Sequence, residues 1–228
     1  MISVAITSYN RDTMTHNSFK RVVDDHRITE IVIIDDCSKI EIYESLQAMA
    51  VDEKVKLYRN PFNLGCYHNK RKAVELCTND WVILLDSDNE LGPDYMNAIN
   101  TIYFDSKVLF APDFARPHFD YTSFSNEIIT KENVNTFIGR NNFDCLVNTC
   151  NFLVNREEYL KVFDKEQEEP WTADTLYFNF CWLQADNKIK VVEGMQYEHL
   201  VHDESHYKLN VSKTGNFFNE TMAKLKQL

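Results

Sequence analysis

Two acidic residues stand at the end of a fully apolar stretch of the chain. Residues 81–85 (WVILL) are followed by Asp86, Ser87 and Asp88. If a strand over this stretch continues, its two-residue period puts both carboxylates on one side, where they repel each other unless a cation lies between them. Hard divalent cations prefer oxygen ligands that they share with substrate phosphates. The spacing predicts a Mg²⁺ or Mn²⁺ site that holds a diphosphate, and the alternative is a solvated turn or a helix cap ahead of Pro93.

A second pair of acids follows another apolar stretch. Asp35 and Asp36 come directly after residues 31–34 (IVII). A carboxylate is a strong acceptor for the N–H and O–H groups of a nucleobase or a ribose. The pair therefore favours a nucleoside site, although Asp36 and Ser38 are equally suited to cap a helix that starts at Ile40.

Short apolar stretches alternate with helical segments through the first half of the chain. The expected strands are residues 2–7, 31–34, 55–58, 81–85 and 108–111, and the expected helices are residues 13–25, 40–50, 66–77 and 93–104. Apolar runs without alternation indicate strands buried on both faces, which is typical of βαβ units in a parallel sheet covered by helices. Ligands bind at the carboxyl ends of such strands, so we expect Asp36 and Asp86 to end neighbouring strands. Tyr9 and Arg11 follow the first strand and are suited to stack on a base and to face phosphate.

The second half of the chain is less regular. Residues 112–142 are aromatic and polar with little periodicity. We expect strands over residues 146–154 and 189–192, helices over residues 156–163 and 172–184, and a terminal helix in the polar tail after residue 198. With no internal repeat and only five glycines to form a hinge, the pattern predicts one compact α/β domain.

The composition limits the classes of protein that are compatible with the chain. The 228 residues carry a net charge of −11 and are 44% hydrophobic, which suffices for a large core and excludes disorder as the main state. A protein with this net negative charge is not expected to bind nucleic acid or an anionic bilayer through its overall surface charge. One local basic cleft is still compatible with the net charge. No apolar run approaches the ~18–20 residues that cross a bilayer, so no transmembrane segment is expected.

Two further absences bear on the compartment. The six cysteines form no C-x-x-C pair and indicate reduced thiols rather than a zinc site or a disulfide framework. No basic region precedes the first apolar stretch, which argues against a signal peptide. We therefore expect a cytoplasmic chain that is either a whole protein or one module of a larger multidomain protein.

Four blocks of the sequence resemble the successive signatures of family-2-type GT-A glycosyltransferases. The blocks are residues 3–11 (SVAITSYNR), 30–38 (EIVIIDDCS), 60–73 (NPFNLGCYHNKRKA) and 81–89 (WVILLDSDN). Their combined order is far more specific than any single block. The resemblance implies a GT-A fold, which is a Rossmann-like, mostly parallel sheet flanked by helices, in a single domain over residues 1–228. Residues 1–110 would form the nucleotide-sugar-binding half, and residues 111–228 the acceptor-binding half with a C-terminal loop and helix.

The resemblance also implies roles on the donor side. The residues that it places around the nucleotide and its phosphates are Thr7, Tyr9, Asp35, Asp36, Asn63, Gly65, Asn69, Lys70 and Arg71. It places Asp86, with Ser87 beside it, at the ribose or the metal, and Asp88 on the metal. Since a sugar nucleotide carries about two phosphate charges, an acidic protein needs a local Lys or Arg to bind it. We expect only one side chain of the basic run 70–72 to point inward, because the rest of that run suits a solvated helix face.

The acceptor side needs a base that removes the proton of the attacking hydroxyl if the anomeric centre inverts. In the family this base is the Asp of a Glu-Asp pair that opens a helix, and the matching residue here is Asp174, although Ala173 replaces the Glu. Glu168 and Glu169 are the fallback bases, and a structural role for Asp174 at a helix N-terminus stays open. Asn151 resembles the polar residue of the acceptor-side strand that faces the donor sugar, and an ordinary buried amide is the alternative.

A histidine-rich segment follows the last expected strand. Residues 197–207 (YEHLVHDESHY) contain three of the seven histidines. His202 and Ser205 match a family pattern of His followed three residues later by Ser, which implies that His202 completes the metal shell or contacts the diphosphate. His199 is the alternate ligand, and a surface cluster is the simpler alternative. The segment is also suited to close over the bound donor and exclude water.

These features predict a metal-dependent glycosyltransferase that moves one sugar from a nucleotide-sugar donor to an acceptor hydroxyl. We expect single displacement with inversion, and UDP as the nucleotide on the basis of family frequency. The Q-x-x-R-W signature of processive synthases is absent, which predicts one sugar added per encounter. The acceptor is expected to be a glycan or a lipid-linked or protein-linked molecule.

Two alternatives come from other classes of protein. A nucleotidyltransferase also uses a Rossmann-like sheet with acidic metal ligands, but it usually has a glycine-rich phosphate loop, and residues 8–13 contain no glycine. A non-catalytic nucleotide or carbohydrate binder on the same scaffold would be expected to have lost one of Asp86, Asp88 and Asp174, and all three are present. A retaining transferase is a variant of the main prediction.

Overall fold

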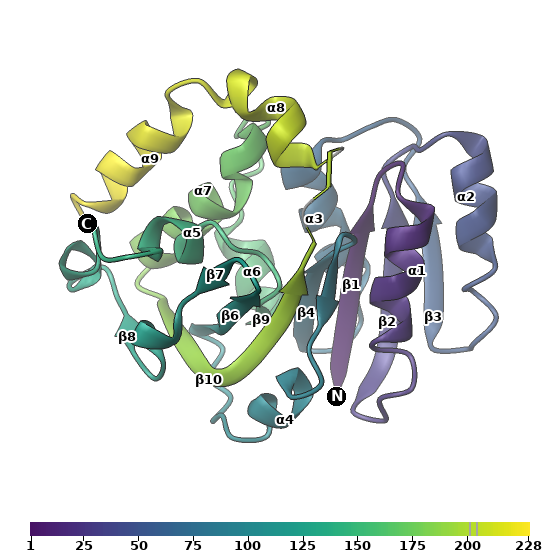
Figure 1. The fold of residues 1–228 in the computed structure, drawn as a ribbon, viewed down its shortest axis with the longest axis horizontal. Helices are drawn as coiled ribbons and strands as arrows, with labels where there is room; N and C mark the ends of the chain where they lie inside the picture. Colours follow the sequence, from purple (N-terminus) through teal and green to yellow (C-terminus); the bar gives the residue numbers. More distant parts are fainter. Residues whose placement is uncertain (201, 204) are drawn as a thin grey trace.

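The computed structural model describes residues 1–200, 202–203 and 205–228, and in this part of the chain one sheet of ten strands runs through the molecule (Figure 1). The strands are β1 Ile2–Ser8, β2 Ile28–Asp35, β3 Val55–Arg59, β4 Trp81–Asp86, β5 Asn89–Leu91, β6 Val108–Arg116, β7 Phe119–Asp120, β8 Ile128–Ile129, β9 Leu153–Asn155 and β10 Lys188–His199. The α-helices are α1 Asp12–Lys20, α2 Ile40–Gln47, α3 Cys66–Leu76, α4 Tyr95–Ile99, α5 Phe143–Val147, α6 Arg156–Val162, α7 Asp174–Gln184, α8 His206–Thr214 and α9 Phe217–Leu225. Short 3₁₀ helices span Thr122–Phe124, Val134–Thr136 and Trp171–Ala173.

The sheet is mostly parallel along its main path, which runs in the order β3-β2-β1-β4-β9-β6-β10-β5. The strands β3, β2, β1 and β4 are parallel neighbours, and β10 is parallel to β6. The short strand β9 runs antiparallel to both β4 and β6 and so joins the two parallel groups. The strands β5, β7 and β8 add short antiparallel pairs. The predicted α/β class is confirmed.

Both faces of the parallel strands are buried, which explains their apolar runs. On β2, Val32 and Ile34 belong to the core that α3, α6 and α7 cover. Ile31 and Ile33 belong to the core on the other face, beside α2 and α4. Because successive side chains of a strand point to opposite faces, a strand between two helical layers needs an apolar residue at every position.

Several expected elements of the chain are wrong or too long, and the helix expected over residues 13–25 already ends at Lys20. The expected strand over residues 146–154 is wrong, because α5 ends at Val147 and β9 begins only at Leu153. Asn151, inside the expected strand, has a φ angle of +64°, so the backbone there is not extended. A short apolar run does not distinguish a buried helix from a strand by its periodicity. The expected helix over residues 93–104 forms only the five residues of α4.

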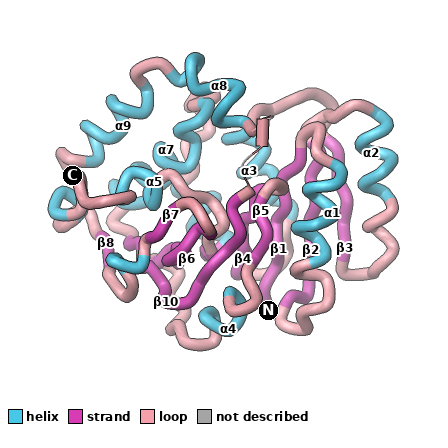
Figure 2. The backbone as a smooth tube through the Cα atoms, viewed as in Figure 1, coloured by secondary structure: helices cyan, strands magenta, loops and turns pink. Residues whose placement is uncertain are grey.

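The expectation that Asp36 and Asp86 end neighbouring strands is also wrong. The strand β1 lies between β2 and β4, and Thr7 of β1 is the partner of Asp86 in the register. The three strands are parallel, so their carboxyl ends still share one edge of the sheet, here called the carboxyl edge. In Figure 2 the loops that follow these strands gather at the upper end of β1, opposite the N-terminus.

The C-terminal helices follow the longest strand and pack on the same side as α7 (Figure 1). Leu225 of α9 is fully buried in the core that α7 also enters. Across the described residues, no helix is both long enough and apolar enough to cross a membrane.

Candidate active site

A buried lysine joins two predicted site residues at the carboxyl edge. Lys70 Nζ lies 3.1 Å from Asp86 Oδ1 at the end of β4 and 2.7 Å from Asp174 Oδ2 at the start of α7. Lys70 and Asp174 are each only 6% exposed. These three residues, here called the Lys70 cluster, bring together the predicted donor half and the predicted acceptor half of the chain.

The charges of the Lys70 cluster control one another's protonation. Burial disfavours the charge of Lys70, but the carboxylates of Asp174 and Asp86 hold its pKa well above the usual value. Burial also acts to raise the pKa of Asp174, yet the Lys70 ammonium outweighs this effect and the pKa is lowered. For Asp86 burial dominates over the attraction of Lys70, and the pKa is raised. Asp174 is therefore ionised at neutral pH, as a general base must be.

A second cluster surrounds Asp88. Its Oδ2 accepts a hydrogen bond of 2.7 Å from Arg11 Nη1 and lies 3.2 Å from His202 Nε2. All three side chains are largely shielded from solvent. The loop after β1, the end of β4 and the segment after β10 thus meet at one carboxylate, here called the Asp88 cluster.

The predicted metal ligands Asp86, Asp88 and His202 have different partners in the structure. Among the residues that the structure describes, no three His, Cys, Asp or Glu side chains are arranged to hold a metal ion. Asp88 and His202 face each other, whereas Asp86 is paired with Lys70. A hard divalent cation commonly takes one or two protein ligands and completes its shell with substrate phosphates and water. The residues present therefore fit a cation shared with a diphosphate rather than one enclosed by protein alone.

Asp36 holds the loop between β3 and α3. Its carboxylate accepts hydrogen bonds from the backbone N–H groups of Leu64 (2.8 Å) and Gly65 (3.1 Å) and from Asn60 Nδ2 (2.8 Å). Asn60 Nδ2 also donates to Asn69 Oδ1 at 2.9 Å. Burial raises the pKa of Asp36 in spite of these hydrogen bonds. The structure thus brings Asp36, Gly65 and Asn69 together and adds Asn60, to which the sequence assigned no role.

Gly65 makes close contact with Glu169, one of the two fallback bases. The φ angle of Gly65 is +81°, and a Cβ at this position would lie 2.2 Å from Glu169 Oε2. Glu169 Oε2 accepts a hydrogen bond from the backbone N–H of Tyr67, and Asn63 Oδ1 accepts one from that of Gly65. Burial, reinforced by the charge of Asp174, raises the pKa of Glu169 to about 8. Glu169 is therefore mostly protonated at neutral pH and is less suited than Asp174 to accept a proton.

Three more predicted residues surround the end of β4. Asn151 Oδ1 accepts a hydrogen bond of 3.0 Å from the backbone N–H of Asp86. Thr7 lies beside Asp86 on the adjacent strand. Ser87 is buried, and its carbonyl oxygen accepts a hydrogen bond of 2.9 Å from Ser18 Oγ. These contacts fix the backbone from which Asp86 and its neighbours project.

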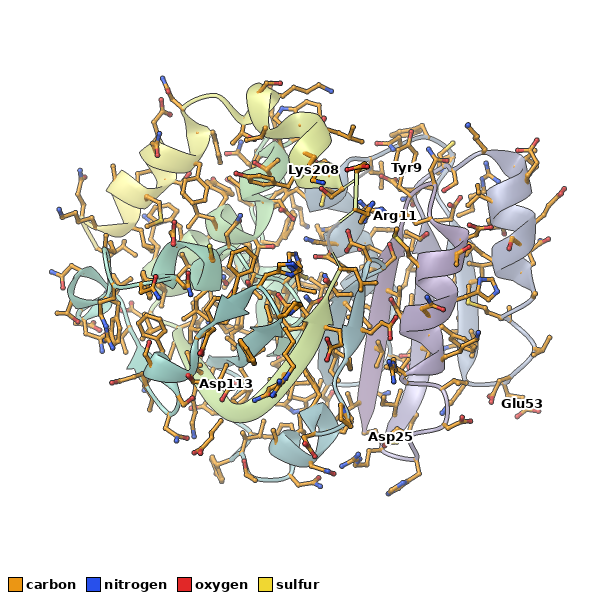
Figure 3. The ribbon with its side chains drawn as sticks, viewed as in Figure 1. Tyr9, Arg11, Asp25, Glu53, Asp113 and Lys208 are labelled. Atoms are coloured by element: carbon orange, nitrogen blue, oxygen red, sulfur yellow. The ribbon has the colours of Figure 1, made fainter. Side chains whose placement is uncertain are left out.

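Other predicted residues lie outside the two clusters. Arg71 pairs with Glu75 on α3, so Lys70 is the inward-pointing member of the run 70–72. Asp35 is fully buried. Tyr9 is 49% exposed and lies at the upper edge of the molecule in Figure 3.

The side chains of the histidine-rich segment contact different parts of the protein. His199 Nδ1 lies 3.2 Å from His118 Nδ1, and burial together with His118 lowers the pKa of His199. His202 instead faces Asp88. Ser205 caps α8 by accepting a hydrogen bond from the backbone N–H of Lys208. Residues 201 and 204 of this segment lie outside the described residues.

A family model described as "Glycosyl transferase family 2" matches residues 3–152, well over half of the chain. The chain belongs to glycosyl transferase family 2. The matched residues include the positions of Asp36, Lys70 and Asp86, whereas Asp174 and His202 lie beyond them. The family membership agrees with the resemblance of the four sequence blocks.

Curated members with a similar sequence match only part of this chain. WcaA of Escherichia coli (strain K12), a glycosyl transferase named for colanic acid biosynthesis, is 26% identical over 101 residues, which are 42% of this chain and 36% of WcaA. TuaG of Bacillus subtilis (strain 168), a glycosyltransferase named for teichuronic acid biosynthesis, is 30% identical over 96 residues, which are 41% of this chain and 38% of TuaG. The matches therefore span little more than a third of these relatives' own length.

Solved structures show the same fold over nearly the whole chain. TarS 1–349 of S. aureus in complex with UDP-GlcNAc has a TM-score of 0.73 at 15% identity, over 98% of this chain and 65% of that chain. The mannosyltransferase PcManGT from Pyrobaculum calidifontis in complex with GDP-Man and Mn²⁺ has a TM-score of 0.69 at 12% identity, over 93% of this chain and 60% of that chain. The predicted GT-A fold is therefore confirmed.

The immediate surroundings of the Lys70 cluster are closely packed. A void of about 10 Å³ lies beside Lys70 and Asp174, and a larger cavity of about 510 Å³ lies elsewhere, between α6 and α7. The Asp86 side chain is 26% exposed, so a ligand would reach the cluster from that side. The sequence did not single out Cys66, whose thiol donates a hydrogen bond of 3.4 Å to Asp174 Oδ2.

Proposed function

We propose that this chain is a metal-dependent glycosyltransferase that moves one sugar from a UDP-sugar to an acceptor hydroxyl with inversion. The observation that carries the proposal is the Lys70 cluster, in which Asp86 of the donor half and Asp174, the expected base, share one buried ammonium group. Membership of glycosyl transferase family 2 supports the reaction class and favours it over nucleotidyl transfer. Asp88 follows Asp86 by two residues, and the Asp88 cluster supplies the groups suited to a diphosphate.

The donor diphosphate would be bound at the Asp88 cluster. Asp88 and His202 are the residues that we assign to a divalent cation, Mn²⁺ or Mg²⁺. Such a cation, when bound, neutralises the diphosphate and makes it a better leaving group. Arg11 adds positive charge at the same point, since its guanidinium lies 2.7 Å from Asp88.

Asp174 would accept the proton of the acceptor. As the acceptor oxygen forms a bond to the anomeric carbon, the bond from that carbon to the diphosphate oxygen breaks, and the hydroxyl proton passes to the Asp174 carboxylate. Attack from the side opposite the leaving group inverts the anomeric centre. The Lys70 ammonium, 2.7 Å from Asp174 Oδ2, orients this carboxylate and keeps it ionised between turnovers.

The donor assignment is tested by thermal unfolding with a panel of nucleotide sugars. UDP is our choice of nucleotide, and the related folds include one complex with UDP-GlcNAc and one with GDP-Man. Because a ligand that binds the folded state raises the melting temperature by mass action, UDP-sugars with Mn²⁺ should raise it. A rise with GDP-mannose alone would replace UDP by GDP. An equal rise without Mn²⁺ and with a chelator would remove the metal from the proposal.

Catalysis is tested separately from binding. Release of UDP from a bound UDP-sugar, on addition of glycan, lipid-linked or protein-linked acceptors, is the expected result. The configuration of the new bond, determined by NMR, distinguishes inversion from retention. Donor binding without release of UDP under any of these conditions would favour the non-catalytic binder.

A further inference from the structure

Two histidines at the carboxyl edge have no role in the proposed function. His199 is the last residue of β10, and His118 lies in the turn that joins β6 to β7. Strand β9 runs antiparallel to both β4 and β6, and β10 is parallel to β6, so β4, β6 and β10 all run in one direction. The carboxyl ends of β6 and β10, and with them these two histidines, therefore lie at the same edge of the sheet as Asp86.

The two imidazole rings approach each other through the same nitrogen atom. His199 Nδ1 lies 3.2 Å from His118 Nδ1, and the ring planes are inclined at 87° with their centroids 5.1 Å apart. Two nitrogen ligands of a tetrahedral Zn²⁺ ion lie about 3.3 Å from each other, because each Zn–N bond is about 2.0–2.1 Å long. The spacing of the two Nδ1 atoms therefore matches that of two ligands of one ion.

The surroundings of the pair favour the neutral form of imidazole, which is the form that binds metal ions. Burial lowers the pKa of His199, and the neighbouring His118 adds to this effect. The charge of the Asp88 carboxylate acts to raise the same pKa, so negative charge that attracts a cation lies within reach of the pair. His118 Nδ1 also lies 3.1 Å from the carbonyl oxygen of His199, and in the empty pair a proton occupies at least one Nδ1. A bound ion takes the place of that proton, which passes to solvent.

The sheet holds the two histidines at this spacing. The backbone N–H of His118 donates a hydrogen bond of 2.9 Å to the carbonyl oxygen of Ala115, and Ala115 pairs with Phe119 across β6 and β7. The ring centroid of Phe119 lies 5.3 Å from that of His199, and Phe119 itself packs against the core. Sites built on strands keep their geometry more precisely than sites built on loops. Because His118 is exposed and His199 is half-buried, an ion can reach the pair from solvent.

We propose that His118 and His199 form a two-histidine site for Zn²⁺, separate from the cation that we assign to Asp88 and His202. Imidazole nitrogen suits Zn²⁺, whereas Mg²⁺ and Mn²⁺ prefer oxygen ligands, so the two sites differ in chemistry as well as in position. Among the described residues no third His, Cys, Asp or Glu side chain completes the pair, so water fills the rest of the shell. The proposal concerns only the two imidazole rings and does not depend on glycosyl transfer.

Calorimetric titration of the whole chain with Zn²⁺, in the absence of donor, tests the site. His118→Asn removes one of the two protein ligands and should lower the Zn²⁺ affinity at least about tenfold. His26→Asn is the matched control, because His26 is also exposed but lies in the turn before β2, and it should change nothing. NMR of the imidazole nitrogens identifies the ligands in the parent protein, without any substitution. The Nδ1 signals of His118 and His199 should shift on addition of Zn²⁺, while both Nε2 atoms keep their protons.

Two results would overturn the zinc proposal. One is a pair of Nδ1 signals that stay unchanged at a Zn²⁺ concentration several times that of the protein. The other is a Zn²⁺ affinity that His202→Asn lowers and His118→Asn leaves unchanged, which would place the ion at the Asp88 cluster. The donor-dependent rise in melting temperature with Mn²⁺ should persist in His118→Asn, and Zn²⁺ binding is measured without donor, so this proposal and the proposed function can fail independently.

Discussion

Removal of the Lys70 charge is the sharpest test of the Lys70 cluster. In Lys70→Met the ammonium that lies 3.1 Å from Asp86 and 2.7 Å from Asp174 is replaced by an apolar group of similar length. Two shielded carboxylates then face each other without a counter-ion. Breaking a buried ion pair by removal of one partner costs about 3–5 kcal/mol of the free energy of unfolding. Lys72→Met is the matched control on the same helix, because Lys72 is 41% exposed and its pair with Glu75 contributes at most about 1 kcal/mol.

The loss of stability should depend on pH in a defined direction. In the parent protein the pKa of Asp174 is lowered, so its contribution to stability is present above the ordinary carboxyl pKa of 3.8 and is lost only as the pH falls through the still lower folded value. Without Lys70 the pKa values of Asp86 and Asp174 both rise. Protonation then relieves their repulsion in the variant at a pH where the parent pair is intact. The difference in unfolding free energy should therefore shrink between about pH 7.5 and about pH 5.

Urea unfolding of the parent, Lys70→Met, Lys70→Arg and Lys72→Met at both pH values measures these effects. The midpoint of Lys70→Met should fall by about 1–2 M at the higher pH. Lys70→Arg keeps the positive charge but places a larger planar group beside a void of only about 10 Å³, so it should recover only part of the loss. The reasoning is refuted if Lys70→Met unfolds within about 1 kcal/mol of Lys72→Met at both pH values, since the lysine would then behave as a surface residue.

Four further expectations follow from the same structure. Asp174→Asn should keep the donor-dependent rise in melting temperature and lower turnover at least about 10²-fold, and near-normal turnover would place the base elsewhere. Asp88→Asn should abolish the effect of Mn²⁺ on donor binding in a calorimetric titration, whereas Asp94→Asn, an exposed acid on another loop, should not. Gly65→Ala should lower the unfolding free energy in urea by about 1–3 kcal/mol, because of its φ of +81° and the contact with Glu169; an unchanged midpoint would contradict this. Burial acts to raise the pKa of Glu30, but Lys56, Ser3 and Thr78 lower it to about 2. Ionised Glu30 should therefore contribute about 2–3 kcal/mol to the free energy of unfolding above its ordinary pKa of 4.5, and this contribution should be lost as the pH falls toward 2. Glu30→Gln should remove that part of the acid dependence in urea titrations.

Local sequence patterns were sufficient to predict most of the first half of the fold. Buried runs such as residues 31–34 and 81–85 appear as β2 and β4 because a strand between two helical layers is apolar at every position. Residues 146–154 do not form the expected strand, because Asn151 in the middle of the stretch has a positive φ angle and interrupts the extended backbone. The hydrophobic periodicity of so few residues does not distinguish a strand from a helix, so tertiary contacts decide the structure there.

The order of strands was not predictable from the runs themselves. The sequence indicated that Asp36 and Asp86 follow strands of one sheet, but not that β1 lies between them. Strand order depends on the face of the sheet over which each connecting helix crosses. Each such crossover is compatible with more than one neighbouring strand. The prediction that both acids lie at the carboxyl edge does not depend on the strand order, because parallel strands end at the same edge in any order.

The sequence by itself determined that acidic and basic residues would gather at one edge of a parallel sheet, because apolar runs that end in Asp can only place those acids where the strands leave the core. It also determined that one basic side chain of the run 70–72 would point inward, since a helix on a sheet has one buried side. Only the tertiary structure decided that this side chain is that of Lys70, that it pairs with Asp174, and that His202 reaches Asp88. Those partners lie more than a hundred residues apart in the chain, and no local pattern encodes a contact that the packing of α3, α7 and the segment after β10 creates.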